Sequence, residues 1–192
     1  MQGFLLLSCV LLLLSGCSDE YVPFPRKYAY PRLSLPTETT YKIFETETCP
    51  FSFEYPAFAE ISRNSPDSCW VNIRFPQFDG TLHVNSREIG GSGLPLEAHQ
   101  EEHRRLIYNH AMKAARIIPS PIDFPSGSGV KYEMTGEVGT PIQIFFHDKD
   151  GTETVTMSFY YQSAVKNDSL APITTYVKAQ IDHLMETFTW KE

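Results

Sequence analysis

A pair of histidines spaced by one helical turn is the first place in the sequence where residue types and spacing could do chemistry. His99-Gln100-Glu101-Glu102-His103 fits the pattern H-x-x-E-H, in which two histidines hold a zinc ion and a glutamate between them takes part in hydrolysis. In that hypothesis His99 and His103 are metal ligands and Glu102 is the catalytic carboxylate of a zinc-dependent hydrolase. The pattern leaves two positions free, and a third ligand would have to come from elsewhere in the chain.

The place of these histidines on the predicted helix favours a structural role instead. On a helical wheel His99 and His103 lie with the apolar residues Leu96 and Ile107 on one stripe, which is the face that packs inward. His110 lies on the same stripe, but it is about 10 Å from His103 along the helix axis and could not share one ion with it. We therefore expect histidines buried at a seam between helix and sheet, with no metal and no cofactor. The zinc-dependent hydrolase is kept as the alternative function.

Cys17 is the next residue for which the sequence predicts a chemical role. The chain is apolar from Phe4 to Leu14 apart from Ser8 and Cys9, a run too short for the roughly 20 residues that span a bilayer and typical of a secretory signal peptide. Leu14-Ser15-Gly16-Cys17 matches a bacterial lipobox, so we expect residues 1–16 to be removed and Cys17 to carry the lipid. Stable anchoring needs two or more acyl chains.

Cys49 and Cys69 are the remaining cysteines of the mature chain. In an oxidising cell envelope a disulfide between them would close about 20 residues and contribute roughly 3 kcal/mol. A simple hairpin between the strands that hold Phe51 and Trp70 would place the two cysteines beyond the roughly 7 Å limit for bridged Cα atoms. The bridge therefore requires that those strands are not neighbours, or that residues 56–68 form a broad loop.

Charge and glycine patterns exclude several other sites. The net charge is −7 and no basic cluster occurs, so nucleic acid is not an expected partner. The segment Gly90–Leu94 breaks the nucleophile-elbow pattern G-x-S-x-G at its last position. We read Gly90–Gly93 and Ser126–Gly129 as flexible loops without the lysine of a phosphate-binding loop. No small-molecule substrate is identified.

The elements that must position these residues are mostly strands. Residues 17–41 contain four prolines and keep no period, which predicts a tether after the lipidated N-terminus. Residues 42–192 then form a single α+β domain, an antiparallel sheet with helices packed on it. Alternation predicts strands ending at Pro56 and Pro76 and a third around residues 82–84, and helical spacing predicts helices over 97–116 and about 173–187. Residues 142–146 and 155–161 form a hairpin across Asp148-Lys149-Asp150-Gly151.

Several segments together resemble a known family. The runs CPFSFEYPAFAEI (49–61), SCWVNIRFPQFDGTLHV (68–84), EAHQEEHRRLIYNHAMKA (97–114), SFYY (158–161), NDSLAP (167–172) and IDHLMETFTW (181–190) occur in the order found in gliding-motility lipoproteins of the GldD type. The element order also resembles the PsbP/Mog1-like α/β/α sandwich. That second likeness concerns the fold alone.

The resemblance implies a non-catalytic cell-envelope lipoprotein of Bacteroidetes that supports gliding motility or the type IX secretion machinery through protein–protein interaction. It implies a membrane anchor at Cys17 and partners among the envelope proteins of that machinery. We expect the domain in the periplasm and favour the outer membrane over the inner one. In that phylum Asp168-Ser169-Leu170 matches an O-glycosylation pattern, which makes Ser169 a candidate acceptor.

Overall fold

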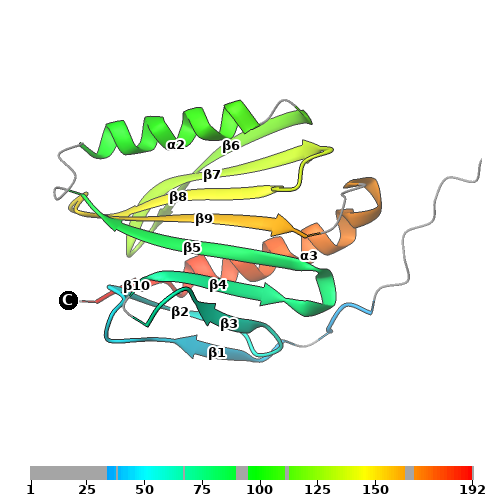
Figure 1. Cartoon of the computed structure of the whole chain (residues 1–192), viewed down its shortest axis with the longest axis horizontal. Coiled ribbons are helices and arrows are strands. Elements are labelled where there is room, and N and C mark those ends of the chain that lie inside the picture. The colour runs from blue at the N-terminus through cyan, green and yellow to red at the C-terminus, as the bar shows by residue number, and fades with distance from the viewer. Residues whose placement is uncertain are drawn as a thin grey trace, which may run out of the picture.

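The computed structural model describes residues 34–37, 39–66, 68–89, 95–110, 113–162 and 167–191, without the side chains of His110 and residues 167–169. The predicted signal peptide, Cys17 and the loop Gly90–Gly93 lie outside these ranges, as does most of the predicted tether. Two sheets and two helices make up the described domain (Figure 1). Within the described ranges neither helix combines the length and apolar character that a membrane crossing needs.

The larger sheet has seven strands, and every pairing in it is antiparallel. Its strands, in spatial order, are β3 (Glu60–Arg63), β4 (Trp70–Phe75), β5 (Gly80–Glu88), β9 (Glu153–Tyr161), β8 (Ile142–Asp148), β7 (Gly127–Gly136) and β6 (Ala114–Phe124). A 3-10 turn at Pro76–Phe78 joins β4 to β5.

The smaller sheet brings the two ends of the described chain together. Its order is β1 (Tyr41–Phe44), β2 (Phe51–Pro56) and β10 (Thr189–Trp190), so the first and last strands lie on either side of β2. Thr39 and Tyr41, which precede or open β1, contact the second helix: the hydroxyls of Thr39 and Tyr176 are 2.9 Å apart, and Tyr41 donates to Gln180 at 3.1 Å.

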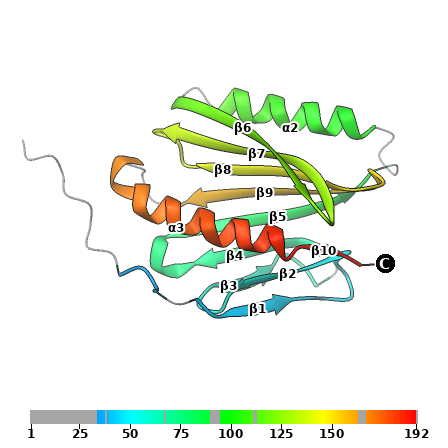
Figure 2. The same ribbon diagram turned by 180° about the vertical axis from the view of Figure 1, so that it is seen from behind.

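One face of the large sheet, which we call the back face, holds most of the apolar core. Helix α3 (Asn167–Glu186) lies across it (Figure 2). The buried residues of α3 recur at helical spacing, as the sequence predicts: Ile173, Val177, Ile181, Leu184 and Met185. They join the buried side chains of the strands and of Phe188 in one large cluster.

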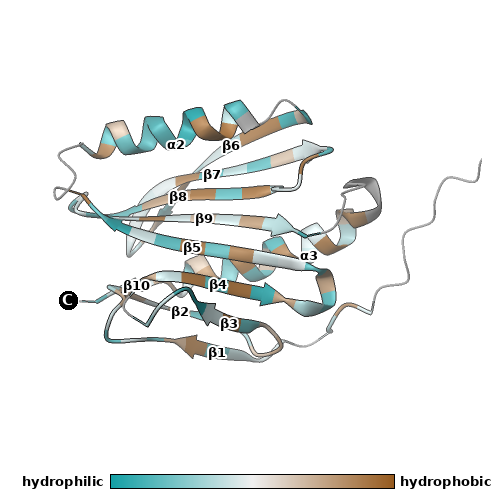
Figure 3. Ribbon diagram, in the orientation of Figure 1, coloured by the Kyte–Doolittle hydropathy of each residue, from teal (hydrophilic) through white to brown (hydrophobic). Residues whose placement is uncertain are grey.

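The opposite face, the front face, is covered only in part. Helix α2 (Leu96–His110) lies over it on the side of β6, β7 and β8, and no described helix lies in front of β4 and β5 (Figure 1). The core beneath α2 is small and consists of Ile107, Tyr132, Met134 and Val138. Figure 3 shows α2 largely hydrophilic, with apolar residues at intervals.

The predicted hairpin across Asp148–Gly151 is confirmed, and the structure gives its register. Ile142 pairs with Phe159, Ile144 with Met157 and Phe146 with Val155. Gly151 takes φ 70°, a conformation that suits glycine. The Asp148 carboxylate accepts hydrogen bonds from the backbone N–H groups of Thr152 and Glu153, at 2.7 and 2.9 Å, and so fixes the turn.

Three predicted boundaries are wrong. The helix predicted to reach Arg116 ends at His110, and Ala114 already begins β6. The loop predicted over Ser126–Gly129 is a tight turn whose glycines belong to β7, where a Cβ at Gly129 would collide with the Phe145 carbonyl oxygen. Helix α3 starts at Asn167, ahead of the predicted start, with Pro172 inside it.

Candidate functional site: the front face beside helix α2

The front face is polar because side chains alternate along its central strands. On β5, Leu82 and Val84 are buried in the back-face core, whereas the alternate residues His83 and Asn85 are only half-buried. On β9, Met157 is buried in the same core. Thr156, Ser158 and Tyr160 take the alternate positions and point to the front face.

Cross-strand pairing assembles these residues into rows. Trp70 pairs with Asn85, which pairs with Thr156, and in the next row His83 pairs with Ser158. Side chains of these rows and of Tyr160 surround an open pocket of about 310 Å³. We call it the front pocket; its lining residues are Trp70, His83, Asn85, Thr156, Ser158 and Tyr160.

His83 contributes the imidazole ring of the front pocket. Its Nδ1 lies 2.7 Å from the Asn72 Oδ1, and because a carbonyl oxygen only accepts, Nδ1 is the donor. Burial lowers the pKa of His83, so the ring is neutral at pH 7 and its Nε2 is an acceptor. The ring also meets Tyr160 edge-on, with centroids 5.4 Å apart.

A second hollow, which we call the helix cleft, lies between α2 and the sheet. Its volume is about 200 Å³, and it shares Asn85 and Thr156 with the front pocket, so the two hollows are adjacent. The remaining lining residues come from α2 and from strands β5, β8 and β9: His99, Glu102, His103, Leu106, Arg87, Phe145 and Thr154.

The two histidines of the H-x-x-E-H pattern face the sheet. His99 is 5% exposed. His103 lies between the rings of Tyr132 and Phe145, at centroid distances of 6.1 and 5.6 Å, and its buried Nδ1 has no hydrogen-bond partner in the described part of the chain. Burial lowers the pKa of His103 from 6.5 to about 4. His103 is therefore a neutral imidazole between the helix and the sheet.

The pattern lacks a third metal ligand among the described residues. In those ranges no group of three or more histidine, cysteine, aspartate or glutamate side chains is arranged to hold a metal ion. Glu102 is exposed on the flank of α2, at the mouth of the helix cleft.

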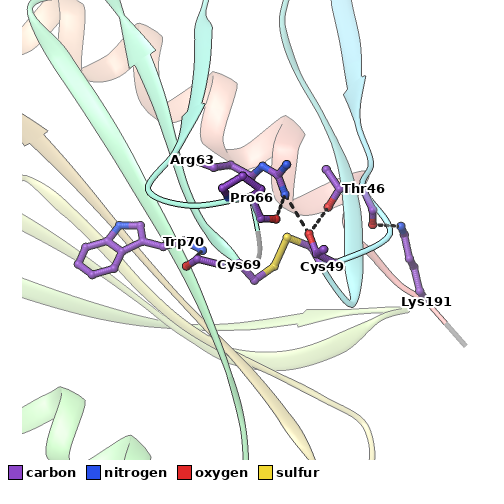
Figure 4. Close-up of a disulfide and its surroundings, with 9 residues drawn as sticks. Thr46, Cys49, Arg63, Pro66, Cys69, Trp70 and Lys191 are labelled. Atoms are coloured by element: carbon purple, nitrogen blue, oxygen red, sulfur yellow. Dashed lines mark hydrogen bonds between the residues drawn. A yellow bond between two sulfur atoms is a disulfide. The ribbon is translucent and has the colours of Figure 1, made fainter.

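The structure joins Cys49 and Cys69 by a disulfide, with their Cα atoms 5.2 Å apart (Figure 4). Strands β2 and β4 are not neighbours: β2 pairs with β1 and β10, and β4 pairs with β3 and β5. This is the arrangement that the bridge requires, and a hairpin between them is ruled out. Cys49 is buried in the back-face core and Cys69 packs against it, so the bridge ties the small sheet to the start of β4.

The sequence did not predict the front pocket, although strand alternation around Trp70 and Tyr160 indicates it. In Trp70-Val71-Asn72-Ile73 and Ser158-Phe159-Tyr160-Tyr161, strand alternation places Trp70 and Tyr160 opposite the buried residues. A large aromatic side chain on the outer side of a strand is the observation that could have found the pocket.

Comparison with known proteins gives a family and a fold. A family model described as "Gliding motility lipoprotein GldD" matches residues 19–190. The solution structure of cyanobacterial PsbP (CyanoP) from Synechocystis sp. PCC 6803 is 13% identical with a TM-score of 0.50, covering 82% of this chain and 97% of that one. The α+β, PsbP/Mog1-like arrangement predicted from the sequence is therefore confirmed.

A crystal structure from Bacteroides thetaiotaomicron VPI-5482 is also similar, at 13% identity and a TM-score of 0.45, covering 79% of this chain and 48% of that one. No curated protein matches the sequence.

Proposed function

The chain belongs to the gliding motility lipoprotein GldD family, and on that premise we propose that it is a non-catalytic envelope lipoprotein that binds proteins of the motility and type IX secretion machinery. The family supplies the role in gliding motility and the lipoprotein character. The partner class and the link to secretion are our proposal.

The anchor in this proposal is Cys17, with the signal peptide removed before it. The family match begins at residue 19, two residues after Cys17 of the lipobox Leu14-Ser15-Gly16-Cys17. The domain then lies in the periplasm, tethered to the outer membrane in preference to the inner one. O-glycosylation of Ser169 remains a prediction, because its side chain lies outside the described residues.

One exposed cluster on α2 carries the protein-binding proposal. The Arg104 guanidinium donates two hydrogen bonds, both of 2.7 Å, to the Glu101 carboxylate. The Arg104 guanidinium also lies 5.5 Å from the centre of the Tyr108 ring, and Tyr108 is 46% exposed. Tyrosine and arginine are enriched among the residues that dominate protein–protein binding energy, and a guanidinium already held in place loses less entropy when a partner docks.

Crosslinking in cells tests this proposal. A photoreactive phenylalanine analogue would replace Tyr108 in the full-length lipoprotein, and the same analogue at Ile43, which is 68% exposed on β1, serves as the matched control. We expect envelope proteins to be captured from position 108 and not from position 43. Equal capture from both positions would refute α2 as the binding surface.

Membrane fractionation tests the anchor separately. Cys17→Ala should give an unprocessed or soluble chain, since the acyl chains that hold the protein are attached through this thiol. If the variant still fractionates with membranes as the processed form, the anchor at Cys17 is refuted.

A further inference from the structure

Two exposed aromatic side chains, Trp70 and Tyr160, line the same hollow on the front face. Trp70 is 43% exposed and Tyr160 is 42% exposed, whereas the aromatic rings of the back face are packed against one another. Burying either ring would stabilise the domain, yet both stand open to solvent at the edges of one pocket. Such rings on a concave surface mark a binding site.

The floor between the two rings consists of uncharged hydrogen-bonding groups. The carboxamide of Asn85 and the hydroxyl of Ser158 have no hydrogen-bond partner among the described residues, and the Nε2 of the neutral His83 ring is an acceptor because its Nδ1 donates to Asn72. The pocket therefore offers both donors and acceptors at short range. A ligand that fills the pocket must therefore carry several neutral groups that can both donate and accept hydrogen bonds.

None of the described residues that line the front pocket is a lysine, arginine, aspartate or glutamate. The nearest arginine on β4, Arg74, is engaged with Glu60 at 3.3 Å. Arg87 and Glu102 line the adjoining helix cleft and carry opposite charges. In a chain of net charge −7, the described lining of the front pocket itself offers an anion no lysine or arginine. The described lining also contains no carboxylate that would bind a cation. The complementary ligand is uncharged.

The spacing of the rings favours a chain-like ligand. Trp70 and Tyr160 stand two strands apart and four residues apart along the strand direction, which places their Cα atoms roughly 16 Å apart. A ligand that touches both rings has two apolar faces separated by polar groups. A peptide normally gains its affinity from main-chain bonds at a sheet edge, and the centre of a sheet face offers no free backbone.

We propose that the front pocket binds a neutral oligosaccharide, with the C–H faces of two sugar rings stacked on Trp70 and Tyr160. Sugar hydroxyls are both donors and acceptors, so they match Asn85, Ser158 and the His83 Nε2 in the floor. The polar character of this floor disfavours a protein partner here, because the core of a protein interface is more apolar and would leave these groups unpaired. The proposal does not depend on the protein-binding surface of α2.

The test is carried out on the full-length chain in detergent micelles. Saturation-transfer NMR measures whether defined oligosaccharides bind to it. Chitotetraose, maltotetraose and mannotetraose are the neutral probes and distinguish acetamido sugars from purely hydroxylated ones; tetragalacturonate is the charged control. We expect at least one neutral probe to bind and the charged control to fail. Trp70→Ala and Tyr160→Ala should each weaken binding roughly tenfold, the loss expected for one stacked ring.

Matched variants separate recognition from folding. Tyr108→Ala removes an equally exposed tyrosine on α2 and should leave saccharide binding unchanged, and Trp70→Phe should retain most of it because a ring remains. Binding that survives both Trp70→Ala and Tyr160→Ala would overturn the proposal, as would the failure of all three neutral probes. Failure of the crosslink at position 108 would refute the α2 surface and leave this proposal standing.

Discussion

The two faces of the seven-stranded sheet are built in opposite ways. The back face is sealed by α3 and the small sheet around an apolar cluster in which Phe51, Phe53, Phe146 and Phe159 are at most 1% exposed. The front face is half open, and its aromatic residues Trp70 and Tyr160 stand in solvent beside polar groups. Stability is concentrated on one side of the sheet, and the other side is free to carry surfaces for recognition.

The largest effect in this comparison should come from Phe188 on the back face. Phe188 is 2% exposed and its ring lies 5.2 Å from Phe51 and 5.5 Å from Phe146. Phe188→Ala should lower the free energy of unfolding by about 4 kcal/mol, since a large cavity is left behind. Urea denaturation measures the loss. A loss smaller than about 1 kcal/mol would show that the back face does not dominate stability.

The Cys49–Cys69 bridge should rank next, because it holds the small sheet against the large one. Its loop spans 20 residues, which corresponds to about 3 kcal/mol from restriction of the unfolded chain. The double variant Cys49→Ser, Cys69→Ser should lose this amount in urea denaturation. Wild-type protein treated with a reductant is the control and should match the variant; equal stability of oxidised and reduced wild-type protein would contradict the prediction.

His103 should make the front face sensitive to acid. Its pKa is about 4 in the folded chain and near 6.5 when unfolded, so between these values the unfolded state binds a proton that the folded state does not. Stability therefore falls as the pH drops from about 6.5 to about 4, by roughly 3 kcal/mol for this group. The groups around the ring are Tyr132, Phe145 and, in the helix cleft, Glu102 and Arg87.

His103→Leu should remove that part of the pH dependence. The measurement is the free energy of unfolding at a series of pH values for wild type and variant, and the difference between the two curves isolates His103 from the carboxylates. Parallel curves over the whole range would show that the pKa of His103 is the same in the folded and unfolded chains.

The smallest stability effect should come from Trp70. The side chain is 43% exposed, so Trp70→Ala should change the free energy of unfolding by only about 0.5 kcal/mol, in contrast to Phe188→Ala. A thermal melt of the two variants side by side checks the contrast. A large loss from Trp70→Ala would mean that the front face also holds the fold together.

Local patterns predicted the strongly periodic elements. The alternation around Phe51 and Phe53 and the apolar stripe of α3 each bury one face against the core, and the hairpin at Gly151 needs a residue that tolerates positive φ. Strand β6 was missed because Pro119 and Pro121 break the strand pattern; it forms at the edge of the sheet, where proline is tolerated.

The candidate site was harder to predict because it depends on which strands become neighbours. His99 and His103 were placed correctly at the seam, since helical spacing alone decides their direction. Trp70 and Tyr160 are 90 positions apart in the sequence, and only the order β4, β5, β9 brings them to one pocket. The disulfide depends in the same way on which strands are neighbours, so the sequence alone does not decide it.

The small sheet also determines how the domain would bear a mechanical load. A pull on the chain ahead of Tyr41 enters at β1, whose register with β2 spans Tyr41–Phe44, and Tyr41 stacks on His183 of α3 with ring centroids 3.8 Å apart. Cys49 lies just before β2, and its disulfide with Cys69 links it covalently to the start of β4. Strand β10 pairs with the other edge of β2. A pull from the N-terminal side would therefore load β1 and its contact with α3 first, and beyond Cys49 the bridge would pass the load into the seven-stranded sheet.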